Sequence, residues 1–494
     1  MKTIEEQVFL SADLYRDKVA FVIGKEKVTY SELKTNILRA KKTYMSLPEY
    51  QPRQAILLSA TKTSEFIYSY FGAHLANLVV LPLDPLLSSQ QLTYVSSSVN
   101  AKFAIGFNEV INGVRNFSYS EISEIRRFLT DVSDDIISFP DLDSVADVMF
   151  TTGTTGHPKG VKLSYLNEAA AVRNINEYIG NQVADVEMMA LPINHSFGLG
   201  RIRCCLSKGQ TIVFVNSFTN VKHLFRLMHE YHVAGFSMVP AAWQYLKKMS
   251  GLKLGEFRDT LRYVEMGSAY LSQDDKSKLA EILPNSRIVM HYGLTEASRS
   301  TFMEFHVDSD CLSSVGKPAP HVKISVFNEF GQEMPDGEVG EICICGEHVS
   351  KGYINEEYPE YKSSDGKLYF RTGDLGFMNE SGYVFLQGRI KEQINVGGKK
   401  VNPIEVEEQI IKIEGIKDCA VVGIPDPAGV LGEVVKAFVV LEDGYDPKDF
   451  AQISKRLLPH LDYYKIPVAV ETLPAIPRTS NGKIQRNLLL QNVH

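Results

Sequence analysis

Cysteine is scarce in this chain of 494 residues, which carries six. No two cysteines form a CxxC pair and histidines do not cluster near them, so a zinc site is not expected. The low count is typical of free thiols in a reducing compartment. No apolar run is long enough for a membrane-spanning helix. Charges interrupt the apolar residues of the first segment, MKTIEEQVFLSADLYRDK, so a signal peptide is not expected either.

A surplus of positive charge is also missing. The chain has 52 Lys and Arg residues against 59 Asp and Glu residues, and its net charge of −7 disfavours non-specific nucleic-acid binding. Neither an internal repeat nor a low-complexity tract stands out. What is present is an apolar fraction of 44%, enough for large cores, over a length that suggests about three domains or subdomains. These features predict a globular, cytoplasmic protein of undetermined oligomeric state.

Strand-like and helix-like segments alternate between about residue 54 and residue 292. Residues 54–60 and 79–84 are typical of buried strands, and residues 64–78 between them predict a helix opened by a serine cap. The alternation closes with a strand over residues 286–293. Such a pattern predicts parallel sheets covered by helices, with ligands beyond the carboxyl ends of the strands. Three loops fall at such ends, namely those after Phe150, Met266 and His291.

The pattern changes after about residue 315. Helices vanish up to residue 388, and an Asp336–Gly337 turn between alternating strands predicts a small antiparallel β subdomain. The residues beyond Arg389 predict a small α+β domain. The expected fold class is therefore α/β. A large N-terminal domain, residues 1–389, would hold two parallel-type α/β subdomains and a β-barrel-like subdomain. A small mobile C-terminal lid, residues 390–494, would follow it.

The segment FTTGTTGHPKG, residues 150–160, is rich in glycine and threonine and follows an apolar run, VADVMF. A polar surface loop explains this composition. A phosphate cradle explains it equally well, because glycines let backbone amides approach an anion while hydroxyls and Lys159 bind it. The common P-loop pattern is absent, since Gly160 and not Ser or Thr follows the lysine. The residues alone favour neither interpretation.

Four further motifs are each ambiguous. In MHYGLTEAS, Thr295 suits a helix cap, whereas Thr295 with Glu296 suits a magnesium ion on phosphates. In YFRTGDLG, Asp374 lies in a predicted turn, and its carboxylate has two acceptor oxygens for the two hydroxyls of a ribose. The stretch after Gly388 is either a charged linker or a hinge. Lys483, in PRTSNGKIQR, is by itself more typical of a solvated lysine than of a catalytic one.

In this order the five motifs resemble those of the adenylate-forming superfamily, which holds acyl- and aryl-CoA synthetases, luciferases and the adenylation domains of peptide synthetases. The resemblance spans most of the chain and includes LPLDPLLSSQQL and YSELKTN. It implies a two-step reaction. A carboxylate attacks the α-phosphate of MgATP to give an acyl-adenylate and pyrophosphate, and a thiol then takes the acyl group and releases AMP.

The resemblance also implies roles for individual residues. The catalytic group would comprise Lys483, which bridges the carboxylate and the α-phosphate, with Glu296, Thr295 and His195. Glu296 and Thr151 would serve the magnesium ion, Asp374 and Arg389 the ribose, and Lys391 would be the hinge of a rotating C-terminal domain. The phosphates would lie against Thr151, Thr152, Gly153, Thr154, Thr155, Gly156 and Lys159. The adenine would lie against Gly267, Ser268, Ala269, His291, Tyr292 and Gly293.

The acid is the least defined part of this prediction. The expected pocket walls are His195, Phe197, Gly200, Ser237, Met238, Gly267, Tyr270, Gly293, Leu294 and Ser298. Such a mixture is typical of an apolar or aromatic acid, and Tyr270 is expected to shorten the pocket. The segment LPINHSFGLGRIRCC carries no acid that would grip an α-amino group. Three arginines, Arg201, Arg203 and Arg299, would either bind a second anionic group or, as we favour, be solvated or paired structurally.

The thiol that accepts the acyl group stays open between two candidates. CoA is the leading one, and a phosphopantetheine carrier protein is the alternative, because the same adenylate can be passed to a tethered thiol. The printed chain shows no fused carrier domain, which favours CoA or a separate partner. A non-catalytic binding module is disfavoured, because Lys483, Glu296, Asp374 and Arg389 are all present. The expected cofactors are ATP, Mg2+ and CoA or the carrier.

Overall fold

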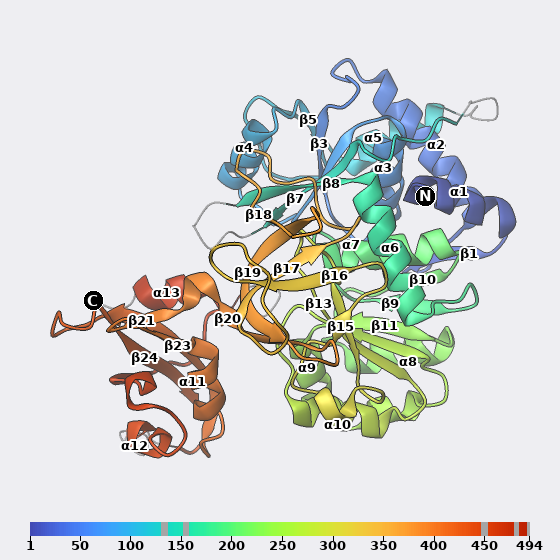
Figure 1. Ribbon diagram of the computed structural model, residues 1–494. Coiled ribbons are helices and arrows are strands. Elements are labelled where there is room, and N and C mark those ends of the chain that lie inside the picture. Colours follow the sequence, from blue (N-terminus) through green and yellow to red (C-terminus); the bar gives the residue numbers. More distant parts are fainter. Residues whose placement is uncertain (130–136, 152–157, 446–452, 479–483, 492–494) are drawn as a thin grey trace. The chain divides into compact units, whose positions relative to one another are not determined.

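The computed structural model describes residues 1–129, 137–151, 158–445, 453–478 and 484–491 (Figure 1). The chain forms two compact units. The first comprises residues 1–312, 316–323 and 344–359, and the second residues 313–315, 324–343 and 360–494. The second unit thus joins the β-rich residues before Arg389 to the C-terminal residues, and the boundary expected after residue 389 stays a prediction.

The larger sheet of the first unit is mostly parallel. Its six central strands pair in parallel, as the alternation of segments predicted, and antiparallel strands flank them on both sides. Within the described residues it has nine strands, in spatial order β15 (Lys317–Pro318), β14 (Thr301–Glu304), β13 (Arg287–Tyr292), β12 (Tyr263–Met266), β11 (Gly235–Met238), β9 (Val186–Met189), β10 (Thr211–Phe214), β1 (Val19–Ile23) and β2 (Glu26–Thr29).

The second sheet of this unit carries the glycine-rich segment at one edge. Its strands, in spatial order and within the described ranges, are β6 (Arg115–Phe117), β5 (Phe103–Ile105), β3 (Ala55–Ser59), β4 (Val79–Leu83), β7 (Val145–Thr151) and β8 (Lys159–Ser164). All neighbours pair in parallel except β7 and β8, which are antiparallel with Thr151 opposite Lys159. Residues 152–157 therefore connect two strands of a hairpin, unlike a P-loop, which joins a strand to a helix.

Two helices of the first unit are buried almost completely. Every residue of α3 from Phe66 to Leu75 is buried, as is every residue of α7 from Phe197 to Leu206. Figure 1 shows α6 and α7 between the two sheets. Helix α3 is capped by Thr63, whose hydroxyl accepts a hydrogen bond from the amide of Phe66, and not by the serine that we expected. The helices are α1 (Ile4–Leu14), α2 (Tyr30–Ser46), α3 (Ser64–Leu75), α4 (Ser89–Ser98), α5 (Tyr119–Phe128), α6 (Tyr165–Ile179), α7 (Ser196–Lys208), α8 (Val221–Glu230), α9 (Pro240–Ser250) and α10 (Gln273–Ile282), with 3-10 turns η1 (Lys253–Phe257) and η2 (Ser309–Cys311).

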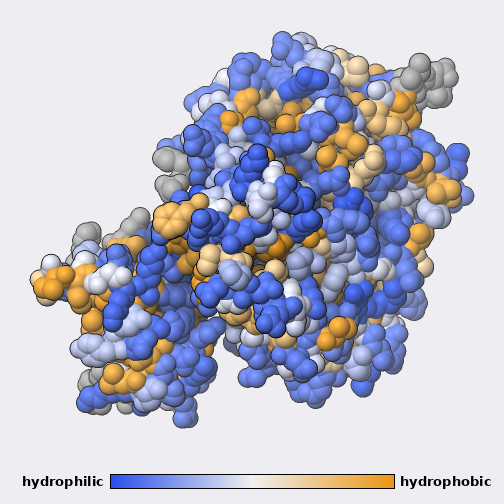
Figure 2. Space-filling view, viewed as in Figure 1, coloured by the Kyte–Doolittle hydropathy of each residue, from blue (hydrophilic) through white to orange (hydrophobic). Residues whose placement is uncertain are grey.

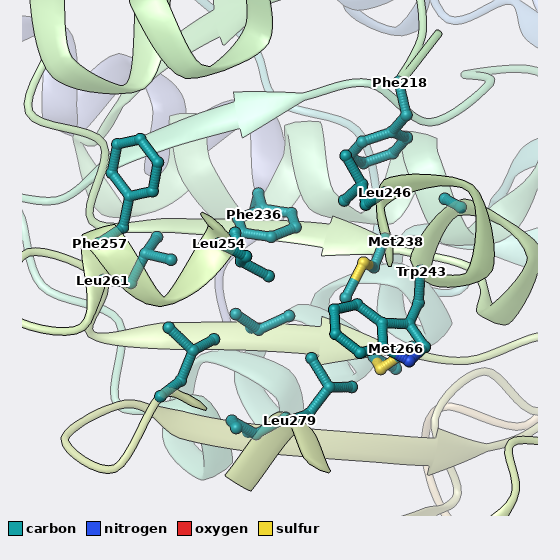
Figure 3. Packing of buried hydrophobic residues seen from close by; sticks show 14 of the residues in the cluster. Phe218, Phe236, Met238, Trp243, Leu246, Leu254, Phe257, Leu261, Met266 and Leu279 are labelled. Atoms are coloured by element: carbon teal, nitrogen blue, oxygen red, sulfur yellow. The ribbon is translucent and has the colours of Figure 1, made fainter. Parts of the chain in front are cut away.

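One face of the nine-stranded sheet carries a large apolar cluster. There a cluster that includes Met188, Met238, Trp243, Met266 and Leu279, here named the outer cluster, packs the strands against α8, α9 and α10 (Figure 3). Trp243 is 0% exposed, and its indole nitrogen donates a hydrogen bond to Asp275 (2.8 Å). By contrast, the visible molecular surface is largely hydrophilic, with apolar residues interspersed (Figure 2). No helix in the described part of the chain is long and apolar enough to cross a membrane.

The second unit is β-rich, as expected. Gly337 has a φ of +86° in the predicted turn between β16 and β17. The expected turn at Thr372–Asp374 is wrong, because these residues lie inside a continuous strand, β19. Its described strands are β16 (Lys323–Phe327), β17 (Gly340–Cys345), β18 (Glu360–Lys362), β19 (Leu368–Met378), β20 (Val384–Arg389), β21 (Ile394–Val396), β22 (Lys399–Val401), β23 (Ile416–Pro425), β24 (Glu433–Leu441) and β25 (Ala469–Thr472); its helices are η3 (Ile390–Glu392), α11 (Pro403–Ile410), α12 (Ile453–Leu457), η5 (Tyr463–Lys465) and α13 (Arg486–Gln491).

Candidate active site

The end of the β7–β8 hairpin gathers several charged and aromatic side chains. Lys159 forms an ion pair with Glu356, and its Nζ lies 5.2 Å from the centre of the Tyr353 ring. The Tyr353 hydroxyl donates a hydrogen bond to Glu296 Oε1 (2.7 Å). Thr151 is the direct cross-strand neighbour of Lys159. One aromatic ring thus links the predicted phosphate-binding lysine to the predicted magnesium-associated glutamate.

Residues 349–354 bring these groups together by main-chain bonds. At one end the amide of Ser350 donates to the carbonyl of Glu296 (2.8 Å). At the other end the amide of Ile354 donates to the carbonyl of Gly160 (2.9 Å), next to Lys159. A Cβ on Gly160 would lie 2.3 Å from Ile354 Cδ1, so a larger residue there would require the Ile354 side chain to move. We name residues 349–354 the bridging segment, because they bind both the 293–299 turn and β8.

The carboxyl ends of β12 and β13 place the predicted adenine-binding residues side by side. The strands pair in parallel with Met266 opposite Met290, so the next residues of each, Gly267 and His291, are also neighbours. A Cβ on Gly267 would lie 2.2 Å from the His291 imidazole. Ser268 follows with a φ of +75°, a conformation that is strained for a residue other than glycine. Parallel pairing explains why these two distant segments meet at one edge.

The 293–299 turn does not lead into a helix. Strand β14 follows it and pairs antiparallel with β13, so Thr295 is not the helix cap that one interpretation of the sequence required. The turn closes on itself through reciprocal main-chain bonds between Leu294 and Ala297. A Cβ on Gly293 would lie 2.5 Å from the amide of Arg299, which fixes a glycine there. Glu296 is 8% exposed at this turn.

The predicted ribose-binding pair lies in the second unit. Asp374 and Arg389 face each other across β19 and β20, with Arg389 Nε 3.0 Å from Asp374 Oδ1. The backbone amide of Asp374 donates a hydrogen bond to the Thr372 hydroxyl (3.0 Å). Lys391 follows within the η3 turn. The two residues that sequence reasoning assigned to one ribose are therefore brought together.

Two predicted pocket residues point to opposite faces of β11. Ser237 is 1% exposed, and its hydroxyl lies between Glu187 Oε1 (3.3 Å) and Glu265 Oε2 (3.2 Å). Met238, its neighbour, belongs to the outer cluster. Because adjacent residues of a strand alternate between faces, Ser237 and Met238 cannot line the same pocket. The rest of the pocket expected from the sequence stays a prediction. Tyr270, also expected there, is 69% exposed.

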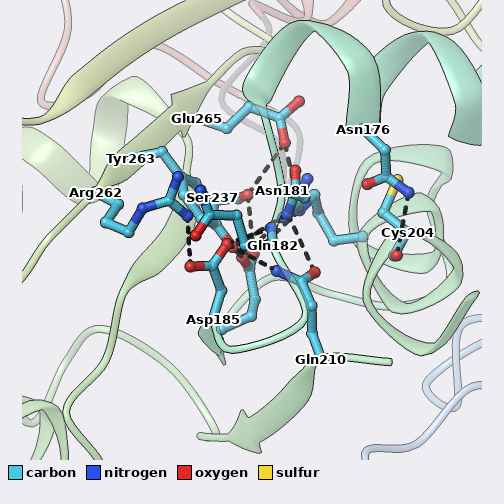
Figure 4. Close-up of polar contacts among 12 residues, drawn as sticks. Asn176, Asn181, Gln182, Asp185, Cys204, Gln210, Ser237, Arg262, Tyr263 and Glu265 are labelled. Atoms are coloured by element: carbon cyan, nitrogen blue, oxygen red, sulfur yellow. Dashed lines mark hydrogen bonds and ion pairs between the residues drawn. The ribbon is translucent and has the colours of Figure 1, made fainter. Parts of the chain in front are cut away.

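A buried set of charges surrounds Ser237, and Figure 4 shows part of it. Arg201 binds Glu187 in a two-pronged contact, with Nε 3.1 Å from Oε1 and Nη2 2.8 Å from Oε2. Arg299 Nε donates to Glu265 Oε1 (3.1 Å). Each buried arginine thus has a carboxylate of the chain, as the favoured interpretation predicted. We name this set the inner network: Glu187, Arg201, Ser237, Tyr263, Glu265, His291 and Arg299.

The pKa values within the inner network follow from burial and charge. Burial alone would raise the pKa of Glu265, but Arg299, the bond from His291 and Arg201 outweigh burial and hold it well below its usual range. Burial lowers the pKa of His291, although Glu265 Oε1 lies 2.9 Å from its Nδ1. His291 is therefore a neutral imidazole beside the ionised carboxylate of Glu265. The two arginines and two glutamates of the network therefore balance in charge.

Arg203 ties α7 to the other sheet. It pairs with Asp147 of β7, and its Nη2 lies 2.8 Å from Glu168 Oε1 of α6. His74 of α3 bonds Asp147 Oδ1 (3.0 Å) and Glu5 Oε1 (2.7 Å). Burial alone lowers the pKa of His74, but the bonds to Asp147 and Glu5 outweigh it and raise the pKa to about 10. Burial raises the pKa of Glu168 well above its usual range.

The N-terminal end of α7 carries two more predicted pocket residues. His195 occupies the N-cap position without a side-chain cap hydrogen bond, so its imidazole does not have the capping role that the sequence left open. The Phe197 ring meets the His291 ring edge-on at 4.7 Å between centres. The Arg299 guanidinium lies 4.8 Å from the centre of the same ring. Phe197 therefore connects the predicted adenine and acid sites.

Several predicted site residues lie outside the described residues. They are Lys483 and the segment Thr152, Gly153, Thr154, Thr155 and Gly156. Their assigned roles stay predictions. No group of three or more His, Cys, Asp or Glu residues within the described ranges is arranged to hold a metal ion.

Sequence reasoning missed Tyr353, Asp147 and the two acids of the inner network, Glu187 and Glu265. Three buried strands each carry one acid among apolar residues, in VADVMF, VEMM and YVEM, and α7 carries two arginines, two residues apart. A charged residue in a buried strand needs a partner. That signal was available in the sequence.

Comparison with known proteins decides the family. Residues 8–354 match the family described as AMP-binding enzyme, and residues 405–483 match the AMP-binding enzyme C-terminal domain. The chain belongs to the AMP-binding enzyme family. This confirms the resemblance noted in the sequence and the mixed α/β fold expected from it.

Members of this family that are similar over most of the chain include CoA ligases. A 2-succinylbenzoate–CoA ligase of Enterococcus faecalis is 28% identical over 95% of both chains, and an oxalate–CoA ligase of Arabidopsis thaliana is 27% identical over 95% of this chain and 94% of its own. The structure of ATP-bound MatB from Rhodopseudomonas palustris is 26% identical, with a TM-score of 0.88 over 99% of this chain and 98% of that one. The present AMP-binding enzyme is an ATP-dependent, AMP-forming acid–thiol ligase of the acyl-CoA synthetase type.

Proposed function

We propose that this ligase forms the acyl-adenylate at the end of the β7–β8 hairpin and passes the acyl group to CoA. The observation that carries this placement is the Lys159–Tyr353–Glu296 connection, in which the bridging segment holds a cation and a carboxylate near one another. MgATP needs both, because the lysine neutralises phosphate charge while the carboxylate binds the metal ion. Catalysis of this anion-on-anion attack is mostly charge neutralisation and alignment.

The residues near Glu296 fit a magnesium ion that takes most of its ligands from phosphates and water. Mg2+ is usually held by one or two carboxylates together with substrate phosphates, so a cage of protein ligands is not needed. Glu296 offers one carboxylate, oriented by Tyr353, and Thr151 offers a hydroxyl at the start of the predicted phosphate loop. When bound, the ion would neutralise charge on the phosphates.

The remaining roles follow the family resemblance. His291, Gly267 and their neighbours take the adenine; Asp374 and Arg389 take the ribose. Lys483 contacts the reacting carboxylate in the first step, and a rotation about Lys391 removes it before the second. The strand pair β21–β22 follows the proposed hinge. A phosphopantetheine carrier protein is the alternative acceptor.

The first experiment measures AMP and pyrophosphate release from MgATP over a panel of carboxylic acids, each with and without CoA. Release that needs one acid and continues for many turnovers only with CoA supports the proposal. About one pyrophosphate per enzyme, unchanged by CoA, would assign the acyl group to a carrier protein. Lys483→Ala should lower pyrophosphate release by at least about 100-fold. Lys417→Ala, at an exposed position of β23, should not.

A second experiment tests the hairpin site itself. Tyr353→Phe removes the hydrogen bond to Glu296 and keeps the ring beside Lys159. We expect the Mg2+ concentration for half-maximal activity to rise several-fold, with little change in the KM of the acid. Tyr358→Phe, in the same stretch, is the matched control. An unchanged Mg2+ dependence in Tyr353→Phe would contradict the role of this connection.

A further inference from the structure

The residues on either side of the stretch that ends at Lys483 lie next to each other in the second unit. Arg478 and Ile484 form an antiparallel bridge, and the amide of Gln485 donates a hydrogen bond to the carbonyl of Pro477 (2.9 Å). Ile484 follows Lys483 directly in the chain, so the contacts that hold Ile484 limit where the lysine can lie.

Apolar contacts hold these flanking residues against the β23–β24 pair. Ile476 and Leu489 are buried in one cluster with Phe438, and Ile484 packs against that cluster. Apolar burial is strong but has no direction, so it keeps the flanks on the sheet without fixing their orientation. An ammonium group that must meet both a carboxylate and a phosphate needs directional contacts as well.

Arg486, three positions after Lys483, makes such contacts. Its Nη2 donates to Glu407 Oε1 of α11 (2.7 Å), and its Nε donates to the carbonyl of Val421 in β23 (3.2 Å). The amide of Val421 donates to the same Glu407 oxygen (2.8 Å). Because the guanidinium is planar and only 15% of the side chain is exposed, these bonds hold Arg486 in one orientation.

A third partner connects Arg486 to the proposed hinge. Arg486 Nη1 lies 3.6 Å from Glu392 Oε2, and Glu392 follows Lys391 directly in the η3 turn. A rotation about Lys391 places a distant lysine accurately only if the residues after the hinge move as one body. Arg486 links the hinge turn, α11 and β23 to the residues that follow Lys483.

The arginine on the other flank is a weaker anchor. Arg478 Nη2 donates to both oxygens of Asp418, at 2.8 and 3.0 Å. Both side chains of this pair are about one-third exposed, and exposed ion pairs contribute little because water and salt screen them. Arg486 is less exposed and contacts three separate elements, so it is the stronger restraint.

We propose that Arg486 is a positioning residue for the first half-reaction, holding the residues around Lys483 in register with the hinge so that the lysine meets the reacting groups in one orientation. The guanidinium acts through Lys483 and not on the reactants themselves. The inference rests on the proposed function, in which Lys483 serves adenylate formation alone. Loss of Arg486 should therefore slow adenylate formation and spare acyl transfer to CoA.

The test measures the two half-reactions separately in Arg486→Ala, with the acid that the panel identifies. Exchange of labelled pyrophosphate into ATP reports the first, and acyl-CoA formation from chemically prepared acyl-adenylate and CoA reports the second. We expect exchange to fall at least about tenfold and acyl transfer to change less than about threefold, because a small displacement of an aligned group is costly only in the step that uses it. Equal losses in both half-reactions, or an unchanged exchange rate, would overturn the inference.

Lys465→Ala is the matched control. Lys465 Nζ also pairs with an acid of α11, Glu405 (2.7 Å), and with a second acid, Asp462, and its side chain is 16% exposed. These partners lie outside the residues that flank Lys483. The variant should keep the wild-type ratio of the two half-reaction rates. A shift of this ratio as large as that in Arg486→Ala would mean that weakening α11 in general is sufficient, and would overturn the specific role of Arg486.

Arg486→Lys separates charge from geometry. It keeps a positive charge beside Glu407 but loses the planar group that reaches three partners. We expect its exchange rate to lie between those of Arg486→Ala and the wild type, with acyl transfer unchanged. An exchange rate as low as that of Arg486→Ala, together with slower acyl transfer, would contradict a positioning role.

Glu392→Gln serves if Arg486→Ala does not fold, judged by circular dichroism. It removes only the partner in the hinge turn, a side chain that is 29% exposed. Exchange should still fall relative to acyl transfer, by a smaller factor. A folded variant with the wild-type ratio would overturn the link between Arg486 and the hinge and leave the ligase function intact. If the wild type exchanges pyrophosphate with no acid, the proposed function and this inference both fall.

Discussion

The two faces of the nine-stranded sheet differ at β9, β11 and β12, although the same strands make both. On one face Met188, Met238 and Met266 are at most 1% exposed within the outer cluster. On the other, their immediate neighbours Glu187, Ser237 and Glu265 are equally buried, but in the charged inner network. Burial alone therefore does not distinguish the faces. The faces are distinguished by the groups that each buried side chain contacts.

The difference separates stability from specificity. A fully buried apolar side chain contributes about 1.5–3 kcal/mol to folding through removal of its surface from water. Buried ion pairs add little net stability compared with apolar residues of similar size, because desolvation offsets their attraction. The inner network is thus a poor source of stability but fixes α7 and the 293–299 turn in position. We expect changes on the outer face to lower stability alone, and changes on the inner face to alter activity as well.

The largest loss of both stability and activity is expected for Glu265→Ala. Its carboxylate accepts from Arg299 and contacts His291, and its removal leaves buried positive charge unpaired. Such a loss typically lowers the free energy of unfolding by about 3–5 kcal/mol. Activity should fall in the remaining folded protein, because Arg299 and His291 lose their orientation. Urea denaturation and pyrophosphate release at a temperature where the variant is folded measure the two effects. A stable, fully active variant would contradict the coupling of the inner network to the site.

Met238→Ala tests the opposite face. It creates a cavity in the outer cluster and should lower the free energy of unfolding by about 2–5 kcal/mol. The relative kcat/KM values across the acid panel should not change, since Met238 points away from Ser237. A changed acid preference would return Met238 to the pocket wall that the sequence predicted. Met238→Leu, which conserves volume, is the control and should cost less than about 1.5 kcal/mol.

Titration of His74 extends the contrast to the six-stranded sheet. Asp147 of β7 lies between buried Ala146 and Val148, and its bond to His74 contributes to a His74 pKa of about 10, above the usual 6.5. The folded chain then holds a proton that the unfolded chain has released. The resulting stability is fully present below pH 6.5 and is lost as pH rises towards 10. The loss should approach about 1.4 kcal/mol per pH unit between pH 7 and 9.

The measurement compares wild type with His74→Gln by urea denaturation at pH 7, 8 and 9. Titrating groups away from His74 act equally in both proteins, so the difference between the two curves reports on His74 and its two carboxylate partners. We expect the difference to shrink as pH rises. A constant difference would mean that His74 is neutral in the folded protein, contrary to the direction argued from its two carboxylate partners.

The sequence predicted much of the fold because its strands are local signals. The strands at residues 55–59, 79–83 and 287–292 lie within a residue or two of the predicted ranges, since runs of apolar residues between polar ones are sufficient evidence for buried strands. The antiparallel pairings of β8 and β14 were not predicted, because pairing direction depends on contacts with other strands. The turn expected at Asp374 is a strand for the same reason: its partner, Arg389, is supplied by β20.

The sequence predicted those site residues that the order of the strands brings together. Gly267 and His291 follow adjacent parallel strands, so their proximity needs only the sheet order. The bond from Tyr353 to Glu296 joins residues 57 positions apart through the bridging segment, which has no signal of its own in the sequence. The pairing of Arg299 with Glu265 likewise depends on packing. What the sequence did contain, and what was overlooked, was a lone acid in each of three buried strands.

The smallest loss of stability is expected for Ser237→Ala. Ser237 is the neighbour of Met238 in β11. The substitution removes a hydroxyl that lies 3.3 Å from Glu187 and 3.2 Å from Glu265, without creating a large cavity. One hydrogen bond is worth about 0.5–1.5 kcal/mol, and both glutamates keep their arginines, so the loss of unfolding free energy should be about 1 kcal/mol. If the inner network determines acid preference, this small change should still alter the relative kcat/KM values of the acids in the panel, whereas the more destabilising Met238→Ala does not. The opposite result, an altered preference in Met238→Ala alone, would show that stability and specificity are not divided between the two faces.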